Sequence, residues 1–313
     1  MNEAVFTLQP APPYDFDRTA AYATYYRGTY GAESYTDGVF RRLLDAGDSL
    51  CLASVRSVGT VDRPLLQVDI TAATLDDTAL AGARRQISWI LGVEQDLLPF
   101  HAMAGEDPTL APLVTRLHGL HMPQTASVYE ALILAIVGQQ ISSQVAATLR
   151  TLLINAYGPS MEVAGQFYRS FPRAKAISAV GIDGLRAVKL SNRKAEYIRD
   201  ISTAITTGEL ELEDMHSCDD EEVVRRLVSI RGVGPWTAHW LLIRALGRSD
   251  GFPHGDLALC RTLGQLMHSA GPMKPQEALE HSRRWSPFRS YVTTYLFAAI
   301  RSRLISTAAK SRP

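Results

Sequence analysis

The sequence contains little cysteine and no long apolar run. Its 313 residues include three cysteines, Cys51, Cys218 and Cys260, which are far apart and odd in number. This favours a reduced, cytosolic setting without a disulfide framework, and three thiolates are too few for a four-cysteine iron–sulfur cluster. The longest apolar stretch, around residues 131–137, is too short to cross a bilayer, so we expect no membrane partner.

The start of the chain also lacks the features of an export signal. Residues 1–17 contain no basic segment followed by an apolar one, so we expect no secretory signal and a cytoplasmic location. Hydrophobic residues make up 46% of the chain and charged residues 20%, which is typical of a soluble globular protein. A chain of this length is expected to form two or three packed units.

A net charge is absent overall, but the charges are unevenly distributed. The 32 basic residues are balanced by 32 acidic ones, which at first argues against a polyanionic partner. From residue 225 to the end, however, 14 basic residues face four acidic ones, a net charge of +10, and the remainder carries −10. Such asymmetry indicates nucleic-acid contact by the basic part, although a solvated basic surface would give the same count.

The apolar pattern divides the chain near residue 95. Residues 49–55 and 65–70 have strand character and residues 76–91 have helical character, which together predict a small α+β domain over residues 1–95. Nothing in its pattern indicates chemistry, so we expect a mainly structural role. Residues 96–313 are expected to be helical, with capping sequences ahead of their apolar runs.

Two glycines one residue apart mark the most informative turn. The segment reads Arg226-Leu-Val-Ser-Ile-Arg-Gly-Val-Gly-Pro-Trp-Thr-Ala-His-Trp240. Gly232 and Gly234 end one helical stretch, and Pro235 suits the first position of the next because a first-turn N–H has no helical partner. Backbone N–H groups at such a helix start can hold a phosphate, which fixes position without reading base sequence.

This segment, with the aspartate of Gly251-Phe-Pro-His-Gly-Asp256, resembles the helix-hairpin-helix motif of the base-excision DNA glycosylases. Within that superfamily the chain is similar to the DNA-3-methyladenine glycosylase II group. The Gly-Val-Gly-x-x-Thr-Ala core with a trailing aspartate is a fairly specific combination. The resemblance also covers Gln9-Pro-Ala-Pro-Pro-Tyr-Asp-Phe16, Gly138-Gln-Gln-Ile-Ser142 and Trp285-Ser-Pro-Phe-Arg-Ser-Tyr291.

The resemblance implies a mainly α fold with a helix-hairpin-helix glycosylase core of two helical domains. That core would occupy residues 96–313 and contain the hairpin at about residues 221–247. Residues 1–95 would form a small N-terminal α+β domain similar to half of the TATA-box-binding fold. The same resemblance implies that Gly232, Gly234 and Thr237 take part in DNA binding.

Asp256 is the expected catalytic residue. Breaking an N-glycosidic bond builds positive charge on the sugar, and a nearby carboxylate stabilises that charge and orients the attacking water. An aspartate at this place can also simply cap the helix that follows, and both roles are compatible.

Trp236 stands where bifunctional members of the superfamily carry a Schiff-base lysine, so we expect hydrolysis without lyase activity. Its electron-rich face suits a cationic purine, and Trp240 lies one turn further on the same side. The alternative for Trp236 is a place in the core. Alignment with the family's pocket residues adds Tyr22 and Phe297 as weaker candidates, since aromatic residues at helical spacing are usually core. Leu257 stands where the family can present tyrosine, a departure that would widen the pocket or change its selectivity.

Gln140 is the candidate wedge. Enzymes that flip a base fill the gap in the duplex with a side chain from a loop between helices. Gln140 lies where the alkylated-base group can use leucine, and its amide could also hydrogen-bond to the orphaned partner base. The alternative is a helix-terminal glutamine bonded to backbone.

The resemblance also implies a hard cation, such as an alkali ion, held in the hairpin by the main-chain carbonyls of Val228, Ile230 and Val233. We expect no required cofactor and no zinc site, because the histidines and cysteines lack a zinc-ligand spacing.

The sequence therefore predicts a monofunctional DNA glycosylase that removes alkylated purines, chiefly of the 3-methyladenine and 7-methylguanine types, in base-excision repair. Its expected partner is double-stranded DNA with alkylated bases, bound by a cytoplasmic, nucleoid-associated monomer. Two alternatives stay open at this point. One is a glycosylase for uracil or for a deaminated or oxidised purine, and the other is a non-catalytic helix-hairpin-helix DNA-binding protein.

Overall fold

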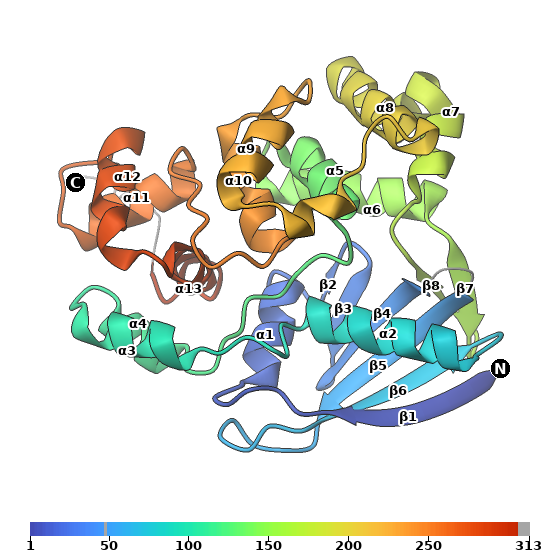
Figure 1. The fold of residues 1–313 in the computed structure, drawn as a ribbon, viewed down its shortest axis with the longest axis horizontal. Coiled ribbons are helices and arrows are strands. Elements are labelled where there is room, and N and C mark those ends of the chain that lie inside the picture. Colours follow the sequence, from blue (N-terminus) through green and yellow to red (C-terminus); the bar gives the residue numbers. More distant parts are fainter. Residues whose placement is uncertain (47–48, 306–313) are drawn as a thin grey trace, which may run out of the picture.

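The N-terminal part of the chain forms a six-stranded antiparallel sheet. The computed structural model describes residues 1–46 and 49–305, and the sheet has the strand order β1-β6-β5-β4-β3-β2 (Figure 1). The strands are β1 (Asn2–Leu8), β2 (Thr29–Tyr30), β3 (Glu33–Thr36), β4 (Val39–Ala46), β5 (Ser49–Ser57) and β6 (Leu66–Ala72). The strands predicted near residues 49–55 and 65–70 are therefore present.

One helix, α2 (Asp77–Ile90), packs on this sheet. Alternate residues of β6 are buried, and Val68 and Ile70 belong to the same core cluster as Ala83 and Ile87 of α2. The period of two in the strand and the helical period in α2 thus direct apolar side chains to one interface. Asp76 caps α2 by accepting a hydrogen bond from the Ala79 N–H at 2.7 Å, as the helix predicted over residues 76–91 requires.

The rest of the chain is mainly helical and has two hydrophobic cores. The first core joins α5 (Val128–Gly138), α6 (Ser143–Tyr157), α7 (Ala174–Ala187), α8 (Asn192–Thr207), α9 (Asp220–Ser229) and α10 (Pro235–Arg244), with the short 3-10 helix η1 (Glu213–Ser217). The second joins α1 (Phe16–Ala23), α3 (Leu98–Glu106), α4 (Ala111–Arg116), α11 (Leu257–Leu266), α12 (Pro275–Ser282), η2 (Arg283–Trp285) and α13 (Arg289–Arg301). A mainly α fold with two helical units and an N-terminal α+β part is confirmed.

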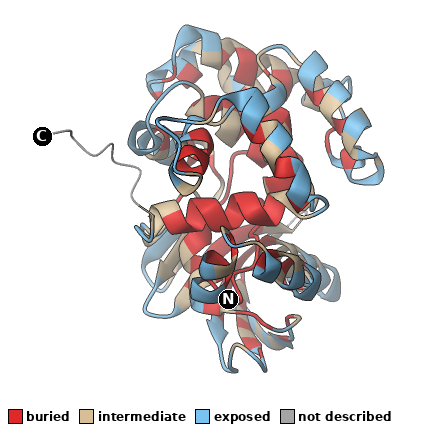
Figure 2. Cartoon of the chain, turned by 90° about the vertical axis from the view of Figure 1, so that its left-hand side faces the viewer, coloured by how far each residue is buried: buried red, intermediate tan, exposed pale blue. Residues whose placement is uncertain are grey.

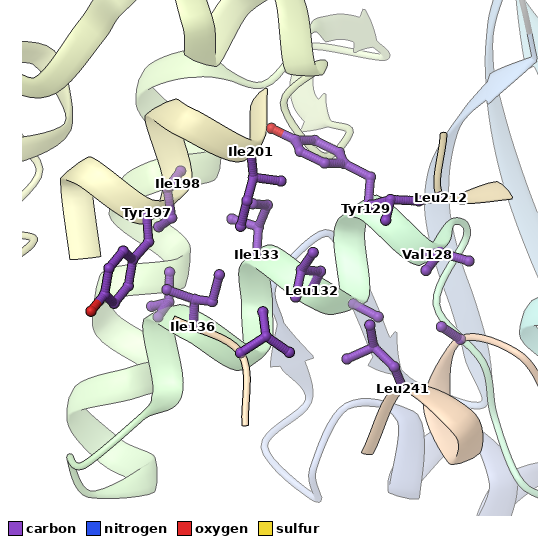
Figure 3. Packing of buried hydrophobic residues seen from close by; sticks show 14 of the residues in the cluster. Val128, Tyr129, Leu132, Ile133, Ile136, Tyr197, Ile198, Ile201, Leu212 and Leu241 are labelled. Atoms are coloured by element: carbon purple, nitrogen blue, oxygen red, sulfur yellow. The ribbon is translucent and has the colours of Figure 1, made fainter. Parts of the chain in front are cut away.

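Each helical core is built around one deeply buried helix. In the first, α5 places Leu132, Ile133 and Ile136 beside Ile198 and Ile201 of α8 (Figure 3). In the second, every residue of α13 from 290 to 299 is buried, and Figure 2 shows the buried residues in red. Helices that are buried on nearly all sides are interior helices, so these two fix the positions of the elements around them.

The expectation of a purely helical region beyond residue 95 was wrong at one place. Strands β7 (Ser160–Val163) and β8 (Gln166–Arg169) form a hairpin that packs near β4 and β5. Ala164 and Gly165 both have left-handed backbone angles, φ 50° and 78°, as a two-residue hairpin turn requires. A short Ala-Gly turn between two four-residue strands has no strong sequence signature, which explains why the pattern did not reveal it.

Candidate active site

A cavity of about 330 Å³ lies where the two helical cores and the N-terminal part meet. This volume is within the range of small-ligand sites and suits a single flipped base. Its aromatic and charged lining residues come from five stretches of the chain: Tyr25, Tyr30, Glu33, Arg150, Trp236, Trp240, Arg244, Asp256, Phe297 and Arg301. A larger cavity of about 590 Å³ lies along α2, between Arg84 and Gln95, and none of these aromatic and charged residues lines it.

Asp256 caps α11 and faces the cavity at the same time. Its Oδ1 accepts hydrogen bonds from the N–H groups of Ala258, at 2.9 Å, and Leu259, at 3.1 Å. Its Oδ2 accepts a hydrogen bond from Trp236 Nε1 at 3.0 Å. The cap fixes the carboxylate through one oxygen, so the other oxygen is held at the cavity in a defined position.

Three aromatic side chains continue the wall from Asp256. The ring centroids of Trp236 and Trp240 are 6.2 Å apart, and those of Trp240 and Phe297 are 5.2 Å apart, with tilted or edge-on planes. All three residues line the cavity, where their faces can contact a flat base. The placement of these residues around one cavity is the arrangement expected from the sequence.

Tyr22, expected in the base pocket, lies elsewhere. Its side chain is 1% exposed in the second helical core and does not line the cavity. Helix α1 ends at Ala23, and the next residues turn sharply because Tyr25 and Tyr26 both adopt left-handed angles, φ 55° and 56°. Each such conformation costs about 1–3 kcal/mol and persists only where the surrounding structure holds it. This turn brings Tyr25 to the cavity in place of Tyr22.

The inner part of the cavity contains three arginines that the sequence analysis did not single out. Arg301 lies over the Tyr25 ring, with 3.8 Å between its guanidinium carbon and the ring centroid. The Tyr25 ring stacks on the Tyr30 ring with 3.9 Å between their centroids, and the guanidinium carbon of Arg150 lies 5.1 Å from the Tyr30 centroid. Burial alone would raise the pKa of Tyr25, but the guanidinium groups of Arg301, Arg244 and Arg150 lower it to about 8.

A buried ion cluster lies next to these residues and joins the sheet to α5. Arg42 of β4 is 1% exposed and pairs with Glu33 and, at 2.5 Å, with Glu130. Burial raises the pKa of Glu33 to about 7; Arg42 opposes this rise and Glu130 adds to it. Because Glu33 also lines the cavity, the N-terminal part contributes directly to the pocket. Residues 1–95, expected to be mainly structural, thus also supply part of the cavity lining.

The two hairpin glycines serve different purposes. Gly232 has φ 91°, and a Cβ there would lie 2.3 Å from Cδ2 of Tyr197, so both backbone and packing require glycine. Gly234 is the N-cap of α10 with φ −111°, and a Cβ there would meet no described atom within 4 Å. No side chain of the described residues caps this helix start, which leaves its first-turn N–H groups available to a phosphate.

Thr237 is an internal residue. Its side chain is buried, and its Oγ1 accepts a hydrogen bond from Gln139 Nε2 at 3.2 Å. The same Gln139 amide donates to the Gly232 carbonyl at 2.9 Å, so this contact ties the hairpin to the loop after α5. The buried Thr237 side chain is therefore not open to DNA, and the part of Thr237 in DNA binding stays a prediction for its backbone N–H in the first turn of α10.

Gln140 and Leu257 both lie at the surface. Gln140, in the same loop, is exposed with φ 57°, a position open to DNA, and its wedge role stays a prediction. Leu257 is 72% exposed and does not line the cavity.

Of the carbonyls predicted to hold a cation, that of Val228 lies in the last turn of α9, and those of Ile230 and Val233 lie between α9 and α10. Ile230 accepts a hydrogen bond from the Val233 N–H at 3.0 Å, which leaves its carbonyl one lone pair for another partner. Within residues 1–46 and 49–305, no three His, Cys, Asp or Glu side chains are grouped so that they could hold a metal ion. None of the helices in this part of the chain is long and apolar enough to span a membrane.

Comparison with known proteins relates this geometry to a family. The model of the "HhH-GPD superfamily base excision DNA repair protein" family matches residues 133–287. A DNA-3-methyladenine glycosylase of Bacillus subtilis is 32% identical over 208 residues, which are 66% of this chain and 69% of that protein. The residues that match the family model include the helix-hairpin-helix and Asp256.

Solved structures show the same fold. The 3-methyladenine DNA glycosylase from Archaeoglobus fulgidus has a TM-score of 0.82 at 24% identity, over 97% of this chain and 100% of that one. A Schizosaccharomyces pombe 3-methyladenine DNA glycosylase in complex with abasic DNA has a TM-score of 0.57 at 26% identity, over 68% of this chain and 100% of that one. The chain thus belongs to the HhH-GPD superfamily of base-excision DNA repair proteins, in the group of the DNA-3-methyladenine glycosylases.

Proposed function

We propose that the protein is a monofunctional DNA glycosylase that hydrolyses the N-glycosidic bond of alkylated purines of the 3-methyladenine and 7-methylguanine types. The observation that carries this proposal is the pairing of Asp256 with Trp236 at 3.0 Å, at the edge of a base-sized aromatic cavity. The names of the matched relatives support the same substrate class.

The carboxylate of Asp256 stabilises the positive charge that develops on the sugar and orients the attacking water. An alkylated purine is cationic and therefore a good leaving group, so the reaction needs no strong general acid. Trp236, Trp240 and Phe297 contact the flipped base through stacking and cation–π attraction.

The lining of the cavity supports the proposal of hydrolysis without lyase activity. Trp236 occupies the hairpin-helix position of a Schiff-base lysine, and the described residues that line the cavity include no lysine. The base leaves and the DNA strand stays intact at an abasic site.

Double-stranded DNA containing alkylated bases is the proposed partner of a monomer. The open N-cap at Gly234 supports phosphate binding, and the +10 net charge of residues 225–313 supports it electrostatically. Gln140 fills the gap left by the flipped base, and an alkali cation bound by the carbonyls of Val228, Ile230 and Val233 would rigidify the hairpin. The enzyme requires no other cofactor.

Incubation with methylated duplex DNA tests the proposal. Chromatography of the released material should show free methylated purines, and a denaturing gel should show intact strands until alkali cleaves the abasic sites. Release of uracil or of an oxidised base in place of methylated purines would assign a different lesion. Binding to DNA without release of any base would instead identify a non-catalytic DNA-binding protein.

A further inference from the structure

A second hollow adjoins the base-sized cavity across the loop that follows α5. This hollow, called here the outer groove, has a volume of about 540 Å³, and its lining includes Gln140, Ile141, Val145, Lys189 and Lys194. Ile141 lines the base-sized cavity as well, so the loop that carries Gln140 separates the two spaces. A base flipped into the cavity and a ligand in the outer groove would therefore lie on opposite sides of one loop.

The lining of the outer groove combines exposed apolar side chains with basic ones. Ile141 is 36% exposed, and Val145, in the first turn of α6, is 47% exposed. Lys189 follows α7, is exposed and forms no ion pair with any described residue. No carboxylate of the described residues lines the groove. An anionic ligand that also presents carbon surface fits this lining, and the sugar–phosphate backbone of DNA has both features.

Hydrogen bonds fix the outer groove relative to the loop and to the hairpin. Lys194 Nζ donates to the carbonyls of Val137 and Gln139, at 2.8 Å each. Gln139 Nε2 in turn donates to the Gly232 carbonyl at 2.9 Å. Both acceptors of Lys194 are uncharged, so its ammonium still adds positive charge to the groove. DNA held at the hairpin would therefore meet Gln140 and the outer groove in a fixed arrangement.

We propose that the outer groove binds the backbone of the DNA strand opposite the flipped base, with Lys189 in contact with a phosphate of that strand. The inference rests on the proposed function and adds a second contact surface for the same partner. When a base leaves the duplex, the gap is bounded on its far side by the complementary strand. Gln140, the proposed wedge, stands between the cavity and the groove, so the strand beyond the wedge is the undamaged one.

Backbone contact to the undamaged strand suits an enzyme that acts in any sequence. A lysine bound to a phosphate positions the duplex and carries no information about the bases. An acidic protein segment would also match the charge of Lys189. However, such a segment would cover Gln140, which lines the same groove, and would keep the wedge away from the duplex. The position of Gln140 thus favours DNA as the occupant.

The test measures binding to a duplex that contains a tetrahydrofuran abasic analogue, which has no base to release. Phosphates of the strand opposite the analogue are replaced one at a time by uncharged methylphosphonates. We expect the wild-type affinity to fall about three- to tenfold at positions near the analogue. Lys189→Met should lose a similar factor on the unmodified duplex, and its salt dependence should be shallower by about one counterion. Methylphosphonates at the sensitive positions should then cause no further loss.

Lys175→Met is the matched control, because Lys175 is exposed on α7 and does not line the outer groove. Its affinity and its response to methylphosphonates should equal those of the wild type. Val145→Glu places a carboxylate in the groove and should also weaken binding to the duplex. Neither Val145→Glu nor Lys189→Met should change the affinity for the analogue-containing strand alone. Thermal unfolding is measured for each protein, and if Lys189→Met does not fold, Val145→Glu decides the result.

Two results would overturn the outer-groove inference. One is a wild-type affinity that no methylphosphonate in the opposite strand changes. The other is a folded Lys189→Met variant that binds the duplex and responds to methylphosphonates as the wild type does. Release of methylated purines from duplex DNA is assayed separately on the same proteins. A wild-type protein that releases none would overturn the proposed function, whatever the binding measurements show.

Discussion

Asp256 and Trp236 hold each other in place, and single residues of this kind decide the chemistry. Asp256 caps α11 through Oδ1 and accepts the Trp236 indole N–H through Oδ2, so its role as a helix cap is compatible with the catalytic role proposed for it. The sequence predicted both partners because they lie in a continuous motif. Tyr25 could not be predicted in this way, because its position depends on a left-handed turn after α1 that adjacent tyrosines do not signal.

Replacement of Trp236 separates its two contributions. Trp236→Ala removes the stacking surface, worth about 1–3 kcal/mol per base, so release of methylated purines should fall about ten- to hundredfold. Trp236→Phe keeps a ring but loses the donor to Asp256, and its loss should be smaller. Single-turnover base release is compared with affinity for undamaged duplex. Equal losses in the two measurements would show that Trp236 supports the fold and does not contact the base.

At the scale of elements, the helix-hairpin-helix of α9 and α10 was predictable, and the two-stranded sheet of β7 and β8 was not. Gly232, Gly234 and Pro235 are local signals, and the structure places α9 and α10 where they indicate. The packing of β7 and β8 near β4 and β5, and the grouping of three arginines at the cavity, bring together segments far apart in the sequence. Arg150, Arg244 and Arg301 are separated by 57 residues or more, and each alone reads as an ordinary helical arginine.

The two hairpin glycines should respond differently to alanine. Gly232→Ala should destabilise the fold, by about 1–3 kcal/mol from backbone strain alone, with a further loss from the clash with Tyr197. Gly234→Ala has room in the free protein and an ordinary φ, so its stability should be unchanged.

For DNA affinity, in contrast to stability, we expect the substitution at Gly234 to matter. Gly234→Val adds bulk where the backbone approaches phosphate, so affinity for every duplex should fall, whatever its sequence. Chemical denaturation and fluorescence titration over a range of salt concentrations give the two quantities. A folded Gly234→Val variant with wild-type affinity and salt dependence would exclude this turn as the phosphate anchor.

The turn that carries Asp256 packs on α10 through a neutral histidine. His239 Nδ1 accepts a hydrogen bond from the Phe252 N–H at 3.3 Å. Burial, with smaller effects of His254 and Arg289, lowers the pKa of His239 to about 4, below its ordinary 6.5. The unfolded chain therefore binds more protons between pH 6.5 and pH 4, and His239 makes folding less favourable as the pH falls through this window.

His239→Asn should remove this acid sensitivity, because asparagine offers an acceptor and does not titrate. The pKa difference corresponds to at most about 2–3 kcal/mol between pH 6.5 and pH 4, reduced by partial solvent exposure. The free energy of unfolding of both proteins is measured across this range. Parallel pH profiles for wild type and variant would show that the imidazole is not held neutral in the fold.

At the scale of the whole molecule, the cavity exists only because three parts of the chain meet. The first helical core supplies Arg150 and Trp236, the second supplies Phe297, and the N-terminal part supplies Tyr25 and Glu33. Composition and periodicity predicted the helical units and the sheet, since these follow from local patterns. They assigned the N-terminal part a structural role, since its contribution to the cavity arises only from tertiary packing.

The most direct test of the account is base release by Asp256→Asn. Asparagine retains one oxygen for the Ala258 and Leu259 N–H groups, so the cap of α11 should persist, while the negative charge and the acceptor for Trp236 Nε1–H are both lost. Single-turnover release of methylated purines from duplex DNA should fall by two orders of magnitude or more, with DNA affinity equal to or higher than that of the wild type. Release by the folded variant at a near-normal rate would contradict the central claim that the carboxylate of Asp256 performs the hydrolysis.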